Sequence, residues 1–232
     1  MKRGFLKWLG SFDWLGNPLH FLAYHFVLRR RSTWFTQAAG MGFSVPPTVF
    51  HPRCFISSER FAEFIGTLDL RGSRVIDVGT GAGILAIAAA RAGSENVIAT
   101  DINPNAALSV PENACRNALG DRVTPVCMDL LSSFAPRPLF DVIMMNPPKH
   151  VGEPRDLADR GWNAGPHHRD VAALFDEAYQ RLKPDGRLFV MFSSHSDLDL
   201  IEKLIARVGF QFRIAKKYSI FIDSFVLYEC TR

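Results

Sequence analysis

The stretch of residues 75–83 constrains the fold of this chain more than any other feature. It reads Val-Ile-Asp-Val-Gly-Thr-Gly-Ala-Gly, an apolar strand that runs into a glycine-rich turn, and an apolar helix follows from Ile84. This order of strand, glycine turn and helix opens a nucleotide-binding α/β fold. The glycines are spaced G-x-G-x-G, whereas dinucleotide pyrophosphates are bound by G-x-G-x-x-G. Asp77 stands two residues before the first glycine, and its carboxylate favours a ligand with an amino group over one with a pyrophosphate.

Two further apolar strands end at acidic residues. The strand over 96–101 ends in Asp101, about twenty residues after the glycine turn, where a carboxylate can bind both hydroxyls of a ribose. Asp101 can also cap the helix that begins near Pro104, and the two roles are compatible. The strand over 123–128 is followed directly by Asp129.

The fourth strand carries a motif with a chemical consequence. It covers residues 140–145 and runs into Asn146, Pro147, Pro148 and Lys149. An Asn side-chain oxygen and the next backbone carbonyl can accept hydrogen bonds from a planar nitrogen, whose delocalised lone pair makes it a poor nucleophile. The prolines fix the backbone, so that the carbonyl is oriented in advance. The structural alternative is a simple turn after a strand.

Together, the glycine turn, the two acids and Asn-Pro-Pro resemble the class I S-adenosylmethionine (SAM) methyltransferases, in particular the release-factor glutamine and N6-adenine enzymes of the small-domain type. The resemblance covers about residues 48–231. It implies a Rossmann-like α/β fold with a seven-stranded, mostly parallel sheet and a reversed last strand. It also implies that Asp129 and the residue after it lie by the adenine. The SAM-binding residues expected from it are Asp77, Gly79, Thr80, Gly81, Gly83, Asp101, Ile102, Asp129, Leu130 and Asn146.

The resemblance also implies a reaction, the N-methylation of a planar amide or amine, with Asn146, Pro147 and Pro148 as the catalytic motif. The family has an aromatic residue next in the motif, which stacks on the group being methylated. This chain has Lys149 there, whose charge can meet an anion. The expected substrate-binding residues are Lys149, Trp162 and His167.

Three functional classes follow from these motifs. The first is a methyltransferase that acts on a glutamine in a protein or on an RNA base. The second is a small-molecule N- or O-methyltransferase of specialised metabolism. The third is a SAM- or NAD-binding module without methyl transfer, although the glycine spacing argues against NAD and the intact Asn-Pro-Pro argues against an inactive enzyme.

The remaining elements follow from periodicity. A helix is expected over 59–68, and Ser57 or Ser58 is expected to be its N-cap. The resemblance instead implies that the segment 50–59, through Ser57 or Ser58, reaches over the methionine end of SAM. After the fourth strand we expect a loop over 159–170, a helix over 171–182, a strand over 187–192, a helix over 197–208, and an antiparallel pair of strands over 210–217 and 221–228.

The composition and the cysteine pattern indicate the cellular compartment and the kind of partner. The chain has 232 residues and four cysteines with no C-x-x-C or zinc-type spacing. We therefore expect free thiols, a cytoplasmic protein and no metal site. No apolar run is long enough for a membrane span, so we expect no stable membrane insertion. The expected partner is the methyl acceptor, and the sequence carries no signal for an oligomeric state.

The N-terminal part differs from the rest in charge. Residues 1–60 contain eight Lys or Arg and two acids, a net charge of +6, against +4 for the whole chain. We expect a helical, aromatic and basic extension over 1–60, with one helix over 18–31, followed by a SAM-binding domain over 61–232. The extension is interpreted as a lid over the substrate, as a surface for nucleic acid or an acidic protein, or as an interfacial membrane or dimer contact.

Overall fold

The computed structural model describes residues 27, 29–53, 56–148, 150–220 and 223–232. Its strands are β1 (Trp34–Ala38), β2 (Met41–Val45), β3 (Arg74–Val78), β4 (Asn96–Asp101), β5 (Val123–Cys127), β6 (Phe140–Met145), β7 (Leu182–Ser193), β8 (Gln211–Ile220) and β9 (Asp223–Thr231). Its helices are α3 (Ile56–Ile65), α4 (Ile84–Arg91), α5 (Pro104–Arg116), α6 (Arg169–Arg181) and α7 (Leu198–Arg207), with short 3-10 turns η3 (Gly120–Arg122), η4 (Asp159–Gly161) and η5 (Pro166–His168).

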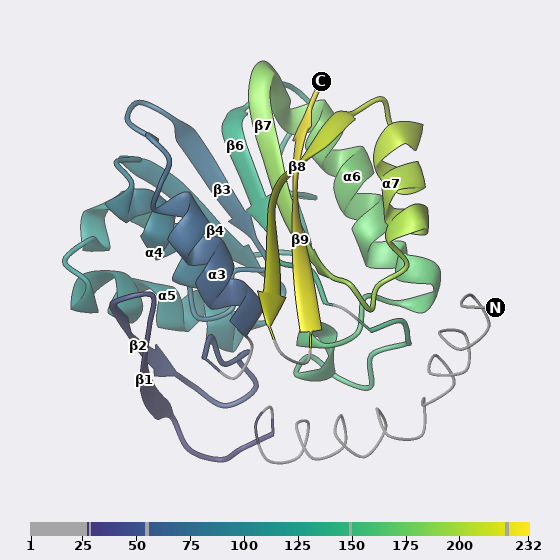
Figure 1. The fold of residues 1–232 in the computed structure, drawn as a ribbon. Coiled ribbons are helices and arrows are strands. Elements are labelled where there is room, and N and C mark those ends of the chain that lie inside the picture. The colour runs from purple at the N-terminus through teal and green to yellow at the C-terminus, as the bar shows by residue number, and fades with distance from the viewer. Residues whose placement is uncertain (1–26, 28, 54–55, 149, 221–222) are drawn as a thin grey trace.

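A seven-stranded sheet forms the centre of the described chain (Figure 1). The strand order is β5-β4-β3-β6-β7-β9-β8. Neighbouring strands from β5 to β7 are parallel, and β9 runs antiparallel to both β7 and β8. The predicted Rossmann-like sheet with a reversed last strand is therefore confirmed. The chain order reverses between β3 and β6, and open α/β sheets bind ligands at such a switch point, outside the carboxyl ends of the strands.

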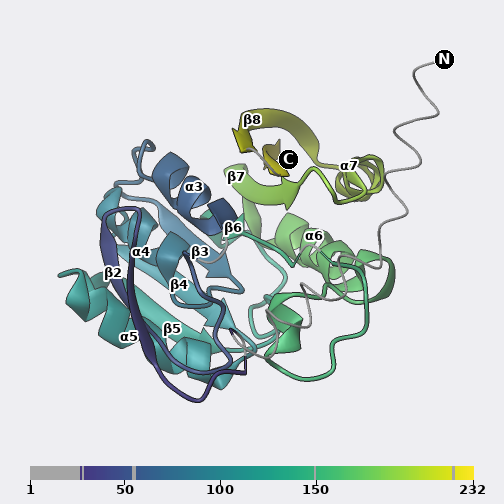
Figure 2. The same cartoon turned by 60° about the horizontal axis from the view of Figure 1, so that its bottom comes forward.

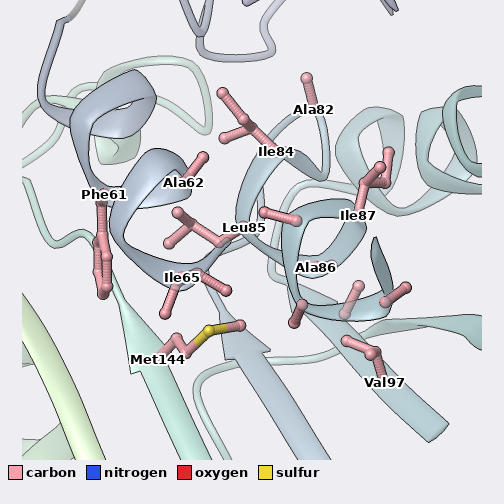
Figure 3. Close-up of a cluster of buried hydrophobic side chains, with 14 of the residues drawn as sticks. Phe61, Ala62, Ile65, Ala82, Ile84, Leu85, Ala86, Ile87, Val97 and Met144 are labelled. Carbon is pink, nitrogen blue, oxygen red and sulfur yellow. The ribbon is translucent and has the colours of Figure 1, made fainter. Parts of the chain in front are cut away.

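Helices cover both faces of the sheet, α3, α4 and α5 one face and α6 and α7 the other (Figures 1 and 2). Successive residues of a strand point to opposite faces, so Val75 packs under the first group of helices and Ile76 under the second. Figure 3 shows Ile65 of α3 beside Leu85 of α4, over Met144 of β6. Helix α4 is buried over all of residues 84–90, and its run of small alanines allows close packing on the sheet.

The prediction of a helical extension over 1–60 is wrong for the part that the structure describes, because β1 and β2 form a separate antiparallel hairpin (Figure 1). The turn between them has Ala39 at φ 49° and Gly40 at φ 69°. Two successive left-handed residues are typical of the two-residue hairpin turn that matches the strand twist. Trp34, Phe35 and Thr36 before it are residues that favour strands.

Two asparagines of α5 attach this hairpin to the domain. Asn113 Oδ1 accepts from Ser44 N at 2.7 Å, and its Nδ2 donates to Ser44 O at 2.9 Å. One helical turn later, Asn117 makes the same pair of bonds with Gly42 N at 3.0 Å and Gly42 O at 2.8 Å. The two amides thus replace a neighbouring strand and satisfy the backbone of β2.

The expected helix over 18–31 lies mostly outside the described residues, as does the aromatic stripe over 5–12. At its end, Arg30 is buried and not part of a helix. Its guanidinium donates to Val45 O at 2.9 Å and to Pro46 O at 2.5 Å. Arg30 therefore fastens the turn that follows β2 and does not contribute to an exposed basic track.

Candidate active site

A pocket opens at the switch point of the sheet, beyond the carboxyl ends of β3, β4 and β6. Its empty volume is about 1100 Å³, counting the part open to solvent. Ten of the residues predicted from sequence line it: Asp77, Gly79, Thr80, Gly81, Asp101, Ile102, Asp129, Leu130, Asn146 and Pro148. The structure therefore brings four separate segments of the sequence around one cavity.

The glycine turn forms the floor of the pocket. Gly79 and Gly81 have φ values of 71° and 56°, in the left-handed region that favours glycine. The nearest atom to a Cβ built on Gly79 is Met145 Cε at 4.0 Å, so a side chain here would take up pocket space. Gly83 has another role, because a Cβ there would meet Val110 Cγ2 at 3.3 Å; it allows α4 and α5 to approach each other.

The buried carboxylate of Asp77 holds the glycine turn in place through hydrogen bonds. Its side chain is 1% exposed, and its Oδ2 accepts from Thr80 Oγ1 at 2.6 Å and from Ala86 N at 3.1 Å. Burial raises the pKa of Asp77 to about 7, although both hydrogen bonds oppose this, and the charge of Asp101 raises it further. These bonds tie the turn to the first turn of α4, and an additional role in binding the amino group of a ligand stays a prediction.

Asp101 lies against the rim of the same turn. Its Oδ2 accepts from Gly81 N at 2.9 Å and its Oδ1 from Asn103 N at 2.8 Å. Burial raises its pKa, and these two hydrogen bonds oppose the rise. The N-cap of α5 is Asn103, which accepts from Asn105 N at 3.0 Å, so the interpretation of Asp101 as that cap is wrong. Each carboxylate oxygen keeps a further lone pair with which to accept from a ribose hydroxyl.

Another part of the pocket wall combines apolar and acidic groups. Leu130 and Leu157 line it, together with Asp129 and Asp170. Arg160 Nη1 lies 3.8 Å from Asp129 Oδ1, and because Asp129 is 58% exposed this ion pair is weak. An apolar wall beside a carboxylate suits a heterocycle with an amine, which is consistent with the adenine position predicted for Asp129 and Leu130.

Asn146 is held by two serines from a distant part of the chain. Its Nδ2 donates to Ser57 Oγ at 3.1 Å and to Ser58 Oγ at 2.8 Å. Both serines lie inside α3, so the prediction that one of them caps a helix over 59–68 is wrong. With Nδ2 committed to the serines, Oδ1 of Asn146 is directed away from them and can accept from another group.

The loop after Asn146 contributes other residues than those predicted. Trp162 is 6% exposed and stacks on His150, with ring centroids 4.9 Å apart, and His167 lies exposed on η5. Neither lines the pocket, nor does buried Pro147. Lys149 lies outside the described residues. The roles predicted for these four residues stay predictions.

Two segments of the pocket wall were not predicted as site residues. One is the segment after the hairpin, Thr48, Val49, Phe50 and Pro52, which overlaps the segment 50–59 that the resemblance places over SAM, and the other includes Arg160 and Gly161. The two segments touch, since a Cβ built on Gly161 would meet Phe50 Cδ2 at 3.3 Å. In the sequence, Gly161 could have indicated this contact, because a glycine in a loop before a helix often marks a place where another segment approaches the backbone closely.

Neither a metal-binding cluster nor a membrane-spanning helix is present among the described residues. In the part of the chain that the structure describes, no three His, Cys, Asp or Glu side chains are grouped to hold a metal ion. Among the same residues, no helix is long and apolar enough to cross a membrane.

Curated proteins similar to this chain include ribosomal protein L11 methyltransferases. That of Methylococcus capsulatus is 30% identical over 149 residues, which are 64% of this chain and 43% of that protein. That of Vibrio vulnificus is 51% identical over 61 residues, which are 26% of this chain and 21% of that protein. The chain thus spans less than half the length of the curated relatives it matches.

Solved structures with the same fold include an RNA enzyme. The Thermus thermophilus 16S rRNA N2 methyltransferase RsmC, in complex with AdoMet (SAM) and guanosine, has a TM-score of 0.64 and 25% identity, covering 87% of this chain and 50% of that one. The ribosomal protein L11 methylase of Lactobacillus delbrueckii subsp. bulgaricus has a TM-score of 0.60 and 24% identity, covering 81% of this chain and 84% of that one, and it supports the fold alone.

The family model described as "Methyltransferase small domain" matches residues 56–221 of this chain. Those residues contain the glycine turn, both strand-end acids and Asn-Pro-Pro. The pocket also fits SAM chemically, since its glycine floor leaves room for a ligand and the Asp101 carboxylate offers acceptors at its rim. The chain belongs to the methyltransferase small domain family of SAM-dependent methyltransferases.

Proposed function

We propose that this chain methylates a planar nitrogen of an RNA base. The observation that carries the proposal is the amide of Asn146, which follows β6 at the edge of the pocket and is fixed by Ser57 and Ser58. An amide oxygen oriented in advance can accept an N–H of the acceptor and hold that nitrogen in line with a methyl donor.

The residues of the chain supply position and polarity. SAM supplies the electrophilic methyl group, so no protein nucleophile is needed. Asn146 Oδ1 would accept from the acceptor nitrogen as positive charge grows on it. The carbonyl of Pro147, predicted as a second acceptor, belongs to a buried residue that does not line the pocket. With SAM bound, the contact with Asn146 would hold the nitrogen lone pair in line with the methyl group, the sulfur would keep the electrons of the broken C–S bond, and the surplus proton on nitrogen would pass to water.

Two findings favour RNA as the source of that nitrogen. RsmC, a 16S rRNA N2 methyltransferase, shares 25% of its aligned residues with this chain and is described with guanosine bound. The described part of residues 1–60 is also basic, with Arg31 and Arg53 exposed.

A ribosomal protein is the second candidate acceptor, and the curated L11 methyltransferases favour it. A small-molecule acceptor is the third, and the basic surface gives it no support.

The site of methylation tests the proposal. The full chain is incubated with SAM labelled in the methyl group and, separately, with ribosomal RNA and ribosomal proteins of the host organism. Digestion and mass spectrometry then locate the label. We expect it on a ring or exocyclic nitrogen of one nucleoside. Label in a peptide would establish the second candidate instead, and label in neither fraction would remove both macromolecular acceptors.

A further inference from the structure

A groove beside the β1–β2 hairpin lies outside the methyltransferase pocket and has no role in the reaction described above. It has an empty volume of about 770 Å³, on the same measure as the pocket, and its walls include Phe35, Gln37, Arg53 and Arg116. We propose that this hairpin groove binds single-stranded RNA on either side of the target base. The inference rests on the proposed function and names the surface that would hold its substrate.

The hairpin exposes aromatic rings in a way that folding alone does not require. Phe35 is 70% exposed and Trp34 is 37% exposed. The Arg116 guanidinium lies 5.2 Å from the centroid of the Phe35 ring. Trp34 does not line the groove, and Arg30 beside it is buried and bonded to backbone carbonyls, so Phe35 and Arg116 are the ring and the cation of this part of the groove. Exposed rings backed by arginines are typical of surfaces that bind single strands, because bases stack on the rings and phosphates meet the cations.

The charges of the groove fit a polyanion. Arg53 is exposed, and Arg116 is paired with Glu112 at 2.9 Å on the exposed side of α5, a pair that water screens. Glu59 of α3 accepts from Ala39 N at 2.8 Å, so this carboxylate is engaged in holding the hairpin turn. An acidic peptide would also be attracted to these cations, but its acidic side chains do not stack on Phe35, whereas every base of a single strand can.

The groove is built on a fixed hairpin, and one short segment contributes to both the groove and the pocket. Asn113 and Asn117 fasten β2 to α5 through both backbone groups of two residues, so the surface is formed before any ligand binds. Pro52 lines the pocket and the next residue, Arg53, lines the groove. An RNA strand lying in the groove would therefore contact the same short segment that also lines the pocket containing Asn146.

Fluorescence anisotropy with a labelled single-stranded RNA of mixed sequence, about 12 nucleotides long, tests the inference. We expect Phe35→Ala in the full chain to weaken binding about tenfold through lost stacking. Arg53→Gln should lower the slope of log Kd against log salt by about one between roughly 50 and 200 mM. The matched controls are Phe212→Ala, which removes another exposed ring on β8, and Arg71→Gln, which removes an exposed charge before β3.

Each outcome of these measurements either supports or overturns the assignment of the hairpin groove to RNA. Losses confined to Phe35 and Arg53 variants support the groove. Equal losses in the control variants, or no loss in any variant, overturn it, and if the same protein still methylates RNA the proposed function survives that failure. Competition by polyglutamate as strong as that by RNA, with no effect of Phe35→Ala, would show an unspecific cationic surface and would also overturn the inference. Absence of RNA binding by the unaltered chain overturns it as well.

Discussion

The two sides of the pocket are built by different means. On the cofactor side, Asp77 and Asp101 accept hydrogen bonds from the glycine turn and from backbone groups close in sequence. On the acceptor side, Asn146 is held by side chains 88 and 89 residues away, and the wall comes from the segment after the hairpin. The cofactor side is thus a local motif, whereas the acceptor side exists only once the whole domain has folded.

This difference separates what each side contributes. The cofactor side contains buried carboxylates whose pKa values are raised. Keeping them charged lowers the free energy of unfolding, but it places polar groups where the ligand binds. The acceptor side uses neutral amides and hydroxyls, which fix geometry at little cost in desolvation. Mutations on the first side should therefore change stability and SAM affinity, and mutations on the second should change turnover.

The largest effect is expected at Asp77. Its pKa of about 7 in the folded protein, against an ordinary 3.8, means that the folded state binds more protons than the unfolded state between these values. Stability therefore falls as pH rises through this window, by about 4 kcal/mol in total. Asp77→Asn removes the titration, so relative to the unaltered chain it should gain about that much free energy of unfolding between pH 4 and pH 8.

Urea unfolding of both proteins at the two pH values gives this number, and the comparison across pH cancels any hydrogen bond lost in the variant. The expectation is contradicted if the stability difference between variant and unaltered chain is the same at both pH values, or if the variant becomes the less stable of the two as pH rises. Either result would show that the cost of burying the carboxylate is fully compensated. The buried carboxylates of the cofactor side would then not lower the stability of the protein.

The same contrast explains what the sequence could predict. Asp77, the glycine turn and Asp101 occupy contiguous patterns whose spacing is set by one strand, one turn and one helix. The hairpin was missed because a helical interpretation of 1–60 rested on residues 5–31 and was extended over a segment whose own residues favour strands. Its attachment through Asn113 and Asn117, like the pairing of Ser58 with Asn146, joins residues far apart in sequence, and one sequence contains no periodicity that reports such contacts.

A smaller effect is expected at Asp101. Asp101→Ala should weaken SAM binding by about 1.5–3 kcal/mol, roughly ten- to a hundredfold, because a buried charged acceptor is lost. Titration calorimetry with SAM measures it. Asp129→Ala is the control on the same side, and since Asp129 is 58% exposed its loss should be smaller. Equal affinities for all three proteins would remove the ribose-binding role of Asp101.

The smallest effect is expected at the serines. Replacing Ser57 and Ser58 together by alanine should lower kcat about tenfold, since each neutral hydrogen bond contributes about 0.5–1.5 kcal/mol. SAM affinity should stay unchanged, because the serines act through Asn146. Single variants should show intermediate losses. A drop in SAM affinity with normal kcat would place the serines on the cofactor side instead. It would contradict the division of the pocket into a cofactor side and an acceptor side.

The central claim is that Asn146 orients the acceptor nitrogen and does little for the cofactor. Its most direct test compares Asn146→Ala with the unaltered chain in two measurements, the rate of methyl transfer to the identified acceptor and the Kd for SAM. We predict a loss of about a hundred- to a thousandfold in kcat with a SAM Kd that is nearly unchanged. Normal turnover in the variant would contradict the account, because Asn-Pro-Pro would then be only the turn that ends β6.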